Sequence, residues 1–473
     1  MILSKTDPSY EFLPREGNIK TENEFLTLSF GSLSLLWLLL SGLFLLVESI
    51  KLHAPEVFNQ LSWLSYGKIH HAAQLSFLGA LTQGLLWMGF SFIASAGQLL
   101  KRSNSLFFIS LSLLNISFIV GIIELLSGNR GHGTLIFPPY SLILFSLGFF
   151  FLVPLLWNTL FKIQKLSPSL MFVALSFWTA PFSLATIISL SCGGYLQGAY
   201  GAWALAWFSH HFISLFLLPL GIATVLNLAQ KYSPKLNQNE ASLRFAFWIY
   251  TISNLMSSRD LIGTPLPFIP AWLRSIETVG SLFLSFSVLI ILHTLFLQLK
   301  PLLSDLKKEI SFPFFVFATT SLALLGVLKS LLAFQEVNQW VQFSTMTNAL
   351  QTLLYFGFLM MIFFAWIYHQ LPYLLERVWA SSSLIQTHFW LSALSTGITI
   401  LALFVASGLQ TYRNATSEIP FLSTVIVIRP LLWIQSLSRV FQFSGALMIS
   451  FLFLLLLLNW KPNPKNSLFY NPR

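Results

Sequence analysis

Residues 202–229 read AWALAWFSHHFISLFLLPLGIATVLNLA, and this stretch decides the fold of the chain. It contains no Asp, Glu, Lys or Arg. A helix needs about 20 mainly apolar residues to cross the hydrocarbon layer of a bilayer. Similar apolar runs recur along the 473 residues. This repetition predicts an all-α membrane protein in which lipid is the solvent.

The composition supports a membrane fold. Hydrophobic residues make up 55% of the chain and charged residues only 9%, whereas an ordinary soluble domain has about 25% charged residues. The 26 Lys and Arg outnumber the 16 Asp and Glu. They occur singly in short loops, so we expect them to face anionic lipid head groups and not nucleic acid. The single cysteine, Cys192, excludes an intrachain disulfide framework and a thiolate cluster.

Twelve transmembrane helices are predicted between residues 26 and 460, with connections too short to hold a folded domain. A cytoplasmic segment of residues 1–25 is expected before this transmembrane domain, and a cytoplasmic tail of residues 461–473 after it. The expected spans are 26–48, 71–98, 105–126, 135–161, 168–192, 202–229, 243–262, 274–299, 312–334, 341–368, 383–408 and 432–460.

The charges in the loops predict the orientation of the bundle. Of the 26 Lys and Arg, 17 would lie on the side shared by both termini and 9 on the other side. Positive charge gathers on the cytoplasmic side of membrane proteins, so both termini are expected in the cytoplasm. Residues 1–24 lack the apolar core of a cleavable signal peptide, and the first apolar run is therefore expected to remain as a span.

Histidines inside the spans are the candidate functional residues. Ionisable side chains at membrane depth are costly, so each needs a partner or a purpose, and histidine is a common ligand of haem iron and of copper. A hydrogen bond across to another helix is the alternative role for each of them. Seven of the nine histidines lie in or near the predicted spans: His70, His71, His210, His211, His293, His369 and His388.

From about Tyr66 to Trp460 the chain resembles subunit I of the haem-copper oxidases. The likeness is closest to the C-family, or cbb-type, cytochrome c oxidases, with nitric oxide reductases as relatives. The resemblance implies a multi-pass protein of a bacterial cytoplasmic membrane with the twelve-helix bundle of that subunit. It rests on short matches along the chain: Gly67–His71 followed by Gly79, Trp207–His211, Lys329 eleven residues before Trp340, His388–Leu391, Ala406–Gln410 and Gly445–Met448.

The resemblance implies one low-spin haem b between two helices. His70, nine residues before Gly79, matches the family's haem ligand in the second helix. The family's tenth helix supplies two further histidines, and Ser344 and Met346 stand at these positions. Serine at 344 would remove the ligand of the high-spin haem. A methionine thioether is a known axial ligand opposite histidine, so His70 and Met346 are the candidate pair. Alternatively, Met346 packs between helices and His70 forms an interfacial hydrogen bond.

The resemblance also implies that the copper site is incomplete. His211 matches the copper ligand of the sixth helix, as a vestigial metal position. The adjacent histidine pair of the seventh helix falls near Asp260 and Leu261, and no histidine occurs between residues 212 and 292. The tyrosine that the family crosslinks for catalysis falls at Asn254. Bound copper is therefore not expected, and catalytic residues for oxygen reduction are not assigned.

The preferred hypothesis is a degenerate subunit I paralogue in a bacterial respiratory or electron-transfer complex. Its expected partners are other membrane subunits and c-type cytochromes. Three alternatives remain. The chain could be a divergent active terminal oxidase or nitric oxide reductase that recruits His293 and His369 as ligands. It could be a transporter whose helices break at Pro181 and Pro219. It could also be a purely structural subunit, so its status as an enzyme stays open.

Overall fold

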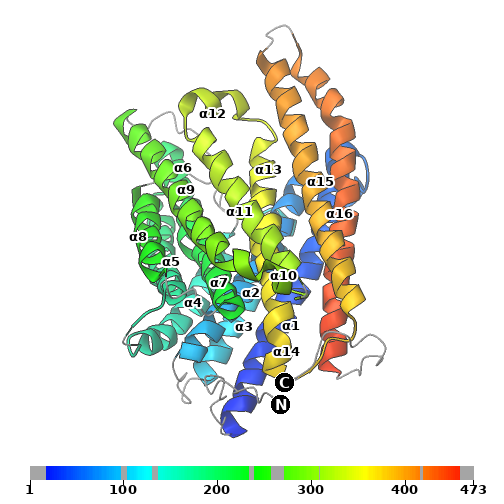
Figure 1. The fold of residues 1–473 in the computed structure, drawn as a ribbon. Helices are drawn as coiled ribbons and strands as arrows, with labels where there is room; N and C mark the ends of the chain where they lie inside the picture. The colour runs from blue at the N-terminus through cyan, green and yellow to red at the C-terminus, as the bar shows by residue number, and fades with distance from the viewer. Residues whose placement is uncertain are drawn as a thin grey trace.

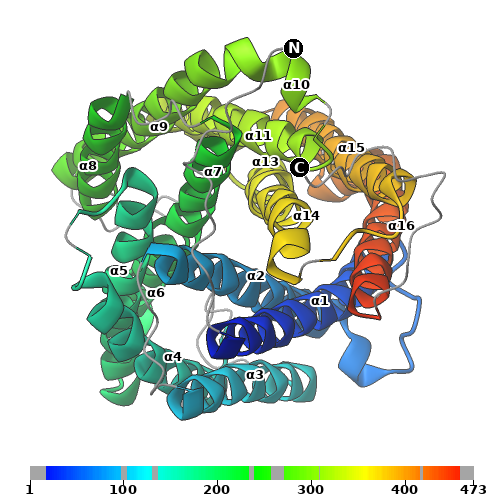
Figure 2. The same ribbon diagram turned by 60° about the horizontal axis from the view of Figure 1, so that its bottom comes forward.

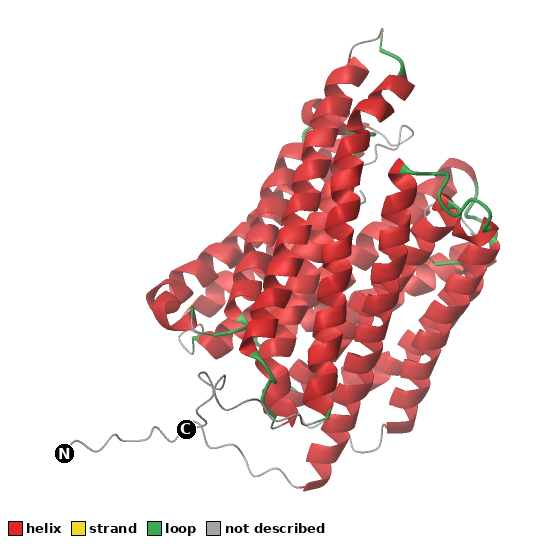
Figure 3. Ribbon diagram, turned by 90° about the vertical axis from the view of Figure 1, so that its right-hand side faces the viewer, coloured by secondary structure: helices red, strands yellow, loops and turns green. Residues whose placement is uncertain are grey.

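The fold was analysed in a computed structural model. It describes residues 17–96, 104–129, 137–163, 165–233, 239–256, 271–307, 309–375, 377–415 and 419–458. Regular structure in these ranges is helical throughout, and Figure 3 shows the helices running along one common direction. Because every backbone N–H and C=O needs a partner in lipid, a bundle of helices is the arrangement that the apolar runs require.

The helical elements follow one another with short connections. In chain order they are α1 (Gly17–His53), η2 (Ser62–Leu64), α2 (Tyr66–Ala96), α3 (Asn104–Ser127), α4 (Pro139–Leu160), α5 (Pro168–Cys192), α6 (Gly198–His211), η3 (Phe212–Leu217), α7 (Leu218–Tyr232), α8 (Glu240–Met256), α9 (Ala271–Leu299), η5 (Lys300–Leu302), α10 (Leu303–Leu306), α11 (Phe312–Leu332), α12 (Gln335–Val341), α13 (Met346–Thr352), η6 (Leu353–Met360), α14 (Met361–Leu375), α15 (Ser382–Ala415) and α16 (Phe421–Leu457).

Eleven helical stretches of the described chain are long and apolar enough to cross a membrane. Helix α8 occupies the place of the predicted seventh span, and 17 of its residues are described. The structure therefore agrees with a bundle of about twelve spans. In Figure 1, α1 begins and α16 ends at the same end of the bundle, as an even number of crossings requires.

Several helix boundaries differ from the predicted ones, and two of these differences concern candidate residues. Helix α2 begins at Tyr66, five residues before the predicted second span. It starts there because the backbone N–H groups of Lys68 and Ile69 donate to the carbonyl of Ser65. The polar His70–His71 pair therefore lies inside the helix. The predicted tenth span starts at residue 341, but α12 ends there and α13 begins only at Met346.

Three spans form the centre of the bundle. In α2, in the continuous α6–η3–α7 span and in the α13–η6–α14 span, 89–94% of the most apolar stretch is buried, compared with 33–47% in the other spans. Figure 2 shows three arcs of helices around this centre, namely α3–α4–α5, α8–α9–α11 and α15–α16–α1. The arcs face lipid, and polar residues of the central helices are shielded from it.

The space between the α3–α4–α5 arc and the centre is filled by aromatic rings. Phe118 contacts Phe145 edge-on with ring centroids 5.8 Å apart, and Phe137 lies 6.1 Å from Phe212 of η3. Such ring pairs stabilise helix packing in a membrane, where the hydrophobic effect does not drive helices together. This part of the molecule is therefore a packed core.

Glycine allows the central helices to approach closely. A Cβ atom on Gly84 of α2 would lie 2.8 Å from the ring of Phe363 in α14. A Cβ atom on Gly221 of α7 would lie 2.7 Å from Leu359 and 2.9 Å from Phe358. Small residues at helix contacts are the usual means of close packing in membranes. The three central spans are thus held in fixed register.

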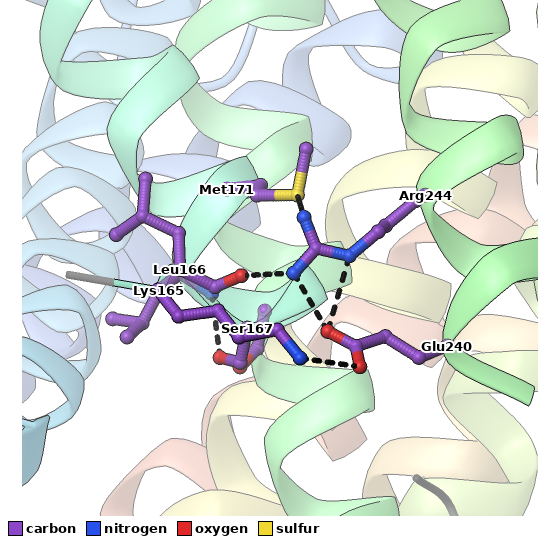
Figure 4. Close-up of polar contacts among 8 residues, drawn as sticks. Lys165, Leu166, Ser167, Met171, Glu240 and Arg244 are labelled. Carbon is purple, nitrogen blue, oxygen red and sulfur yellow. Dashed lines mark hydrogen bonds and ion pairs between the residues drawn. The ribbon is translucent and has the colours of Figure 1, made fainter. Parts of the chain in front are cut away.

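An ion-pair cluster joins the connection before α5 to the start of α8 (Figure 4). The Arg244 guanidinium donates to Glu240 at 2.6 Å and to the backbone carbonyl of Leu166 at 2.6 Å. Lys165 lies 3.4 Å from the other oxygen of the same carboxylate. The hydrogen bond from Arg244 lowers the pKa of Glu240 below its ordinary value. We call Lys165, Glu240 and Arg244 the Glu240 clasp.

Candidate functional site

The first candidate residue, His70, lies one turn into α2 and is held by two side chains. Its Nδ1 atom is 2.7 Å from Oε1 of Glu48 in α1, and its Nε2 atom is 3.0 Å from the amide nitrogen of Gln74. A carboxylate can only accept, so Nδ1 carries the proton and Gln74 donates to Nε2. The lone pair of the neutral imidazole therefore lies on Nε2, the atom that would bind iron.

Two further side chains extend this site across to α16 and η6. The buried guanidinium of Arg439 in α16 lies 4.9 Å above the ring of Phe356 in η6. The Phe356 ring in turn contacts Phe77 of α2 at 4.4 Å. Residues from α1, α2, η6 and α16 thus surround one region of the bundle. We call Glu48, His70, Gln74, Phe356 and Arg439 the His70 cluster.

Met346 lies in the span that meets α2 at Phe77, and it is not among the contacts of the His70 ring nitrogens. It is the first residue of α13, its backbone N–H donates to Oγ of Ser344, and its side chain packs half-buried against the core. The spans of His70 and Met346 meet at Phe77 and Phe356. At 1.5 Å per residue, His70 and Met346 lie roughly 10 and 15 Å from that meeting point, toward the same end of the bundle.

The second histidine pair lies at the end of α6, deep in the bundle. His211 donates from Nδ1 to the backbone carbonyl of Trp207 at 2.8 Å, and its ring packs against the Trp207 ring. His210 is only 1% exposed, and neither of its ring nitrogens has a hydrogen-bond partner among the described residues. Oγ of Ser214 and Oδ1 of Asn254 are also buried without a partner there.

These buried polar atoms gather in one place. Tyr250 of α8 donates its hydroxyl proton to the backbone carbonyl of Ser214. Because α6 and α8 run in opposite directions, this contact places His210, one turn before Ser214, opposite Asn254, one turn after Tyr250. Lys329 of α11 also lies within electrostatic reach of His210. We call His210, Ser214, Tyr250 and Asn254 the His210 cluster.

The residues expected at the family's metal positions serve other contacts where the structure describes them. Ser344 forms a 2.7 Å hydrogen bond with Ser407 of α15 and another with the carbonyl of Val341. The described residues contain no group of three or more His, Cys, Asp or Glu that could hold a metal ion. Asp260 and Leu261 lie outside the described residues.

The histidines considered as replacement ligands lie in aromatic surroundings. His369, in α14, packs its ring against those of Tyr232 and Tyr373. His388, in α15, forms a 2.8 Å hydrogen bond between Nδ1 and the hydroxyl of Tyr368. His293 lies in α9, on the outer arc of the bundle. None belongs to a metal-binding group of the described chain.

Two of the candidate residues, His211 and Met346, are followed by π-helical segments that were not predicted from the sequence. Segment η3 starts directly after His211, and η6 starts seven residues after Met346. π-Helical turns are rare and often mark functional sites. For η3 the sequence did carry a signal, because Pro219 has no N–H to donate to Leu215. The carbonyl of Leu215 instead accepts a hydrogen bond from Thr179 at 2.9 Å.

The comparisons with known proteins identify the family. The family model "Cytochrome C and Quinol oxidase polypeptide I" matches residues 26–441, so the chain belongs to the haem-copper oxidase subunit I family. A cryo-EM structure described as a heme-copper terminal oxidase dimer superposes with a TM-score of 0.59 at 14% identity, covering 97% of this chain and 87% of that one. No curated protein sequence matches the chain.

The family membership and the oxidase-like bundle confirm the resemblance drawn from the short sequence matches. The closer likeness to the C-family and the loss of metal ligands remain predictions. Two residues of the site were not assigned a role from the sequence, Glu48 and Arg439. Their signal was present, because each is a charged residue within a long apolar stretch, where charge calls for a partner.

Proposed function

We propose that this chain is a membrane subunit of a respiratory electron-transfer complex, with the oxidase subunit I bundle but without the high-spin haem–copper centre. We propose further that it holds one low-spin haem b, with His70 and Met346 as axial ligands. Its electron-transfer partners would be other membrane subunits and c-type cytochromes. The observation that carries the proposal is the pair formed by His70 and Glu48.

The His70 cluster fits a haem ligand in its chemistry. Metal-binding histidines usually donate their second ring N–H to a carboxylate or carbonyl, which fixes the tautomer and the ring orientation. Glu48 holds Nδ1 in this way and leaves the Nε2 lone pair for iron. Iron on Nε2 would replace the amide of Gln74, a flexible side chain. The bound haem would supply one-electron transfer, and His70 and Met346 would hold it in place.

The His210 region supports the absence of the oxygen-reducing centre. Dioxygen reduction in this family needs a five-coordinate haem iron facing a copper ion with three histidine ligands. Serine stands at position 344, and residues 212–292 contain no histidine. His211 would supply only one of the three imidazoles that the copper needs. Neither metal of that centre has a sufficient set of ligands.

The test is a reduced-minus-oxidised absorbance spectrum of the purified complex, together with the same spectrum of the His70→Ala variant. We expect a b-type signal in the parent protein and its complete loss in His70→Ala. His71→Ala is the matched control and should keep the signal. A correctly folded parent protein without any haem would contradict the haem assignment, and oxygen consumption with stoichiometric copper would favour the active-oxidase alternative.

A further inference from the structure

The π-helical segment η3 lies between His211 and α7, in the interior of the bundle. Its turn is closed by the backbone N–H of Leu218, which donates to the carbonyl of Ile213, five residues earlier. Two hydroxyl groups from neighbouring helices donate to the backbone of this segment. We infer that one of them, the hydroxyl of Tyr250 in α8, holds η3 in its π register and thereby decides which of the two adjacent histidines faces α8. The inference does not depend on the haem proposed at His70.

Pro219 leaves η3 with a backbone carbonyl that no N–H can reach. In the π register of this segment, the donor for the Ser214 carbonyl would be Pro219, five residues on, and proline has no N–H. The hydroxyl of Tyr250 donates to this carbonyl instead. Ser214 and Tyr250 are both 0% exposed, so an unpaired carbonyl here would have no water as a replacement partner. Tyr250 therefore makes the π register stable.

An α-helical register would need a different side chain. Its hydrogen bonds span four residues, so the N–H of Leu218 would serve Ser214, and the carbonyl without a donor would be that of Leu215. Thr179 of α5 already donates to the Leu215 carbonyl at 2.9 Å. The α register would thus also have its hydroxyl donor, but the Tyr250 hydroxyl would lose its acceptor. Of the two hydroxyl groups, only that of Tyr250 favours the π register.

The register of η3 controls the direction in which His210 points. A π turn contains one residue more than an α turn. Gly221 fixes α7 against η6, because a Cβ atom there would lie 2.7 Å from Leu359. If η3 closed to an α-helix, each residue of α6 would move back by one place relative to α7, which is a rotation of about 100°. His211 would then occupy the place that His210 holds opposite Asn254.

The two ends of the α6–η3–α7 span are held differently. Residues 218–226 of α7 are all buried, whereas Ala202 of α6 is exposed. Gly194 and Gly198, just before and at the start of α6, have positive φ angles of 73° and 60°, and no atom lies within 4 Å of the place of their Cβ atoms. Glycine there can adopt other backbone angles at little cost. We therefore expect α6, and not α7, to turn when the register changes.

The experiment is a cryo-EM map of the full complex carrying Tyr250→Phe, with the histidine that faces Asn254 as the readout. Phenylalanine keeps the ring but leaves the Ser214 carbonyl without a donor in the π register. A buried carbonyl without a partner shifts such an equilibrium by roughly 10- to 100-fold, so we expect the α register to become the major one. His211 should then face Asn254.

Thr179→Val is the matched control. It also removes a hydroxyl that donates to η3, but its acceptor, the Leu215 carbonyl, lacks an N–H donor in the α register as well. We therefore expect this variant to keep the π turn and His210 opposite Asn254. A π turn with His210 still in that place in Tyr250→Phe would overturn the inference, and so would a change of register in Thr179→Val.

A deletion tests the register by a second route, which applies even if Tyr250→Phe does not fold. Removing Ile213 takes out the extra residue of the π turn, so η3 should close as an α-helix and the protein should fold. Removing Ala223 from α7, where no π turn can absorb the loss, should abolish folding. In the Ile213 deletion, adding Tyr250→Phe should not lower the melting temperature. An equal loss of folded protein in both deletions, measured by size-exclusion chromatography, would overturn the inference.

Discussion

The two histidine pairs of this protein lie in opposite electrostatic surroundings. His70 is near a helix start, about one-third exposed, and both its ring nitrogens are hydrogen-bonded, one to a carboxylate. His210 is buried in the centre of the bundle, and its nitrogens have no hydrogen-bond partner among the described residues. The comparison shows that two histidine pairs that look alike in the sequence differ in the hydrogen-bond partners that the fold gives them.

The two clusters differ in the same way in the hydrogen-bond partners of their histidines. In the His70 cluster the imidazole has a fixed tautomer and a carboxylate partner from a neighbouring helix. In the His210 cluster the imidazole is buried without such a partner among the described residues, and Asn254 stands where the resemblance places the tyrosine that the family crosslinks. Belonging to the haem-copper oxidase subunit I family therefore predicts the bundle more securely than the reaction.

The largest effect on stability is expected from His70→Phe. The substitution leaves the Glu48 carboxylate largely buried without its imidazole donor, and orphaning a buried acceptor costs about 1–3 kcal/mol, more when the acceptor is charged. The melting temperature of the purified protein in detergent would measure the loss. His71→Phe, one residue along the same helix, is the control. Equal melting temperatures for the two variants would show that the contact between Glu48 and His70 does not form.

The second effect concerns the packing that holds both clusters in register. Gly84→Ala would place a Cβ atom 2.8 Å from Phe363, and overpacking of this kind costs about 1–3 kcal/mol. Gly397→Ala in α15 meets no atom within 4 Å, so it should be neutral or slightly stabilising. Thermal unfolding of both variants tests the difference. A neutral Gly84→Ala would mean that α2 and α14 are less closely packed.

The third prediction sharpens the contrast at His210. Replacing this side chain with phenylalanine removes buried nitrogens that have no partner in the described chain, so His210→Phe should be neutral or stabilising by about 1 kcal/mol. The sign is thus opposite to that of His70→Phe. A marked loss of stability would show that an ordered water or a ligand satisfies His210 in the native protein.

The smallest effect is expected at the Glu240 clasp, which lies outside both clusters. The pKa of Glu240 is lowered in the folded state by the hydrogen bond from Arg244. Its contribution is therefore present above the ordinary carboxyl pKa and is lost as the pH falls through the lowered value. A surface pair is worth about 0.2–1 kcal/mol. Melting temperatures of the parent and Glu240→Gln should differ slightly at pH 7 and converge in acid.

The sequence predicted the bundle well because one physical requirement dominates it. Apolar runs long enough to cross lipid, such as residues 202–229, can be recognised without any knowledge of the third dimension. The predicted seventh span, 243–262, runs beyond Met256, the last residue of α8 that the structure describes. The break between α12 and α13 was also missed, since phenylalanine is not a residue type that signals the positive φ of 65° found at Phe343.

The candidate site could be predicted only in part. The matches around His70, His211 and Met346 came from linear spacing. The partners of these residues came from other helices: Glu48 lies 22 positions before His70, and Arg439 lies on the last span. No local pattern connects such residues, because the tertiary packing of α1, α2 and α16 brings them together. The π-helical turn η6 likewise has no proline or other local signal.

The most direct test of the central claim is to count the iron and copper atoms per chain in the purified complex. The proposal that the oxidase bundle is kept while the high-spin haem–copper centre is lost predicts one haem iron and no copper associated with this subunit. Two haem irons and one copper per chain would contradict it, and would show that the missing ligands are supplied from elsewhere in the protein.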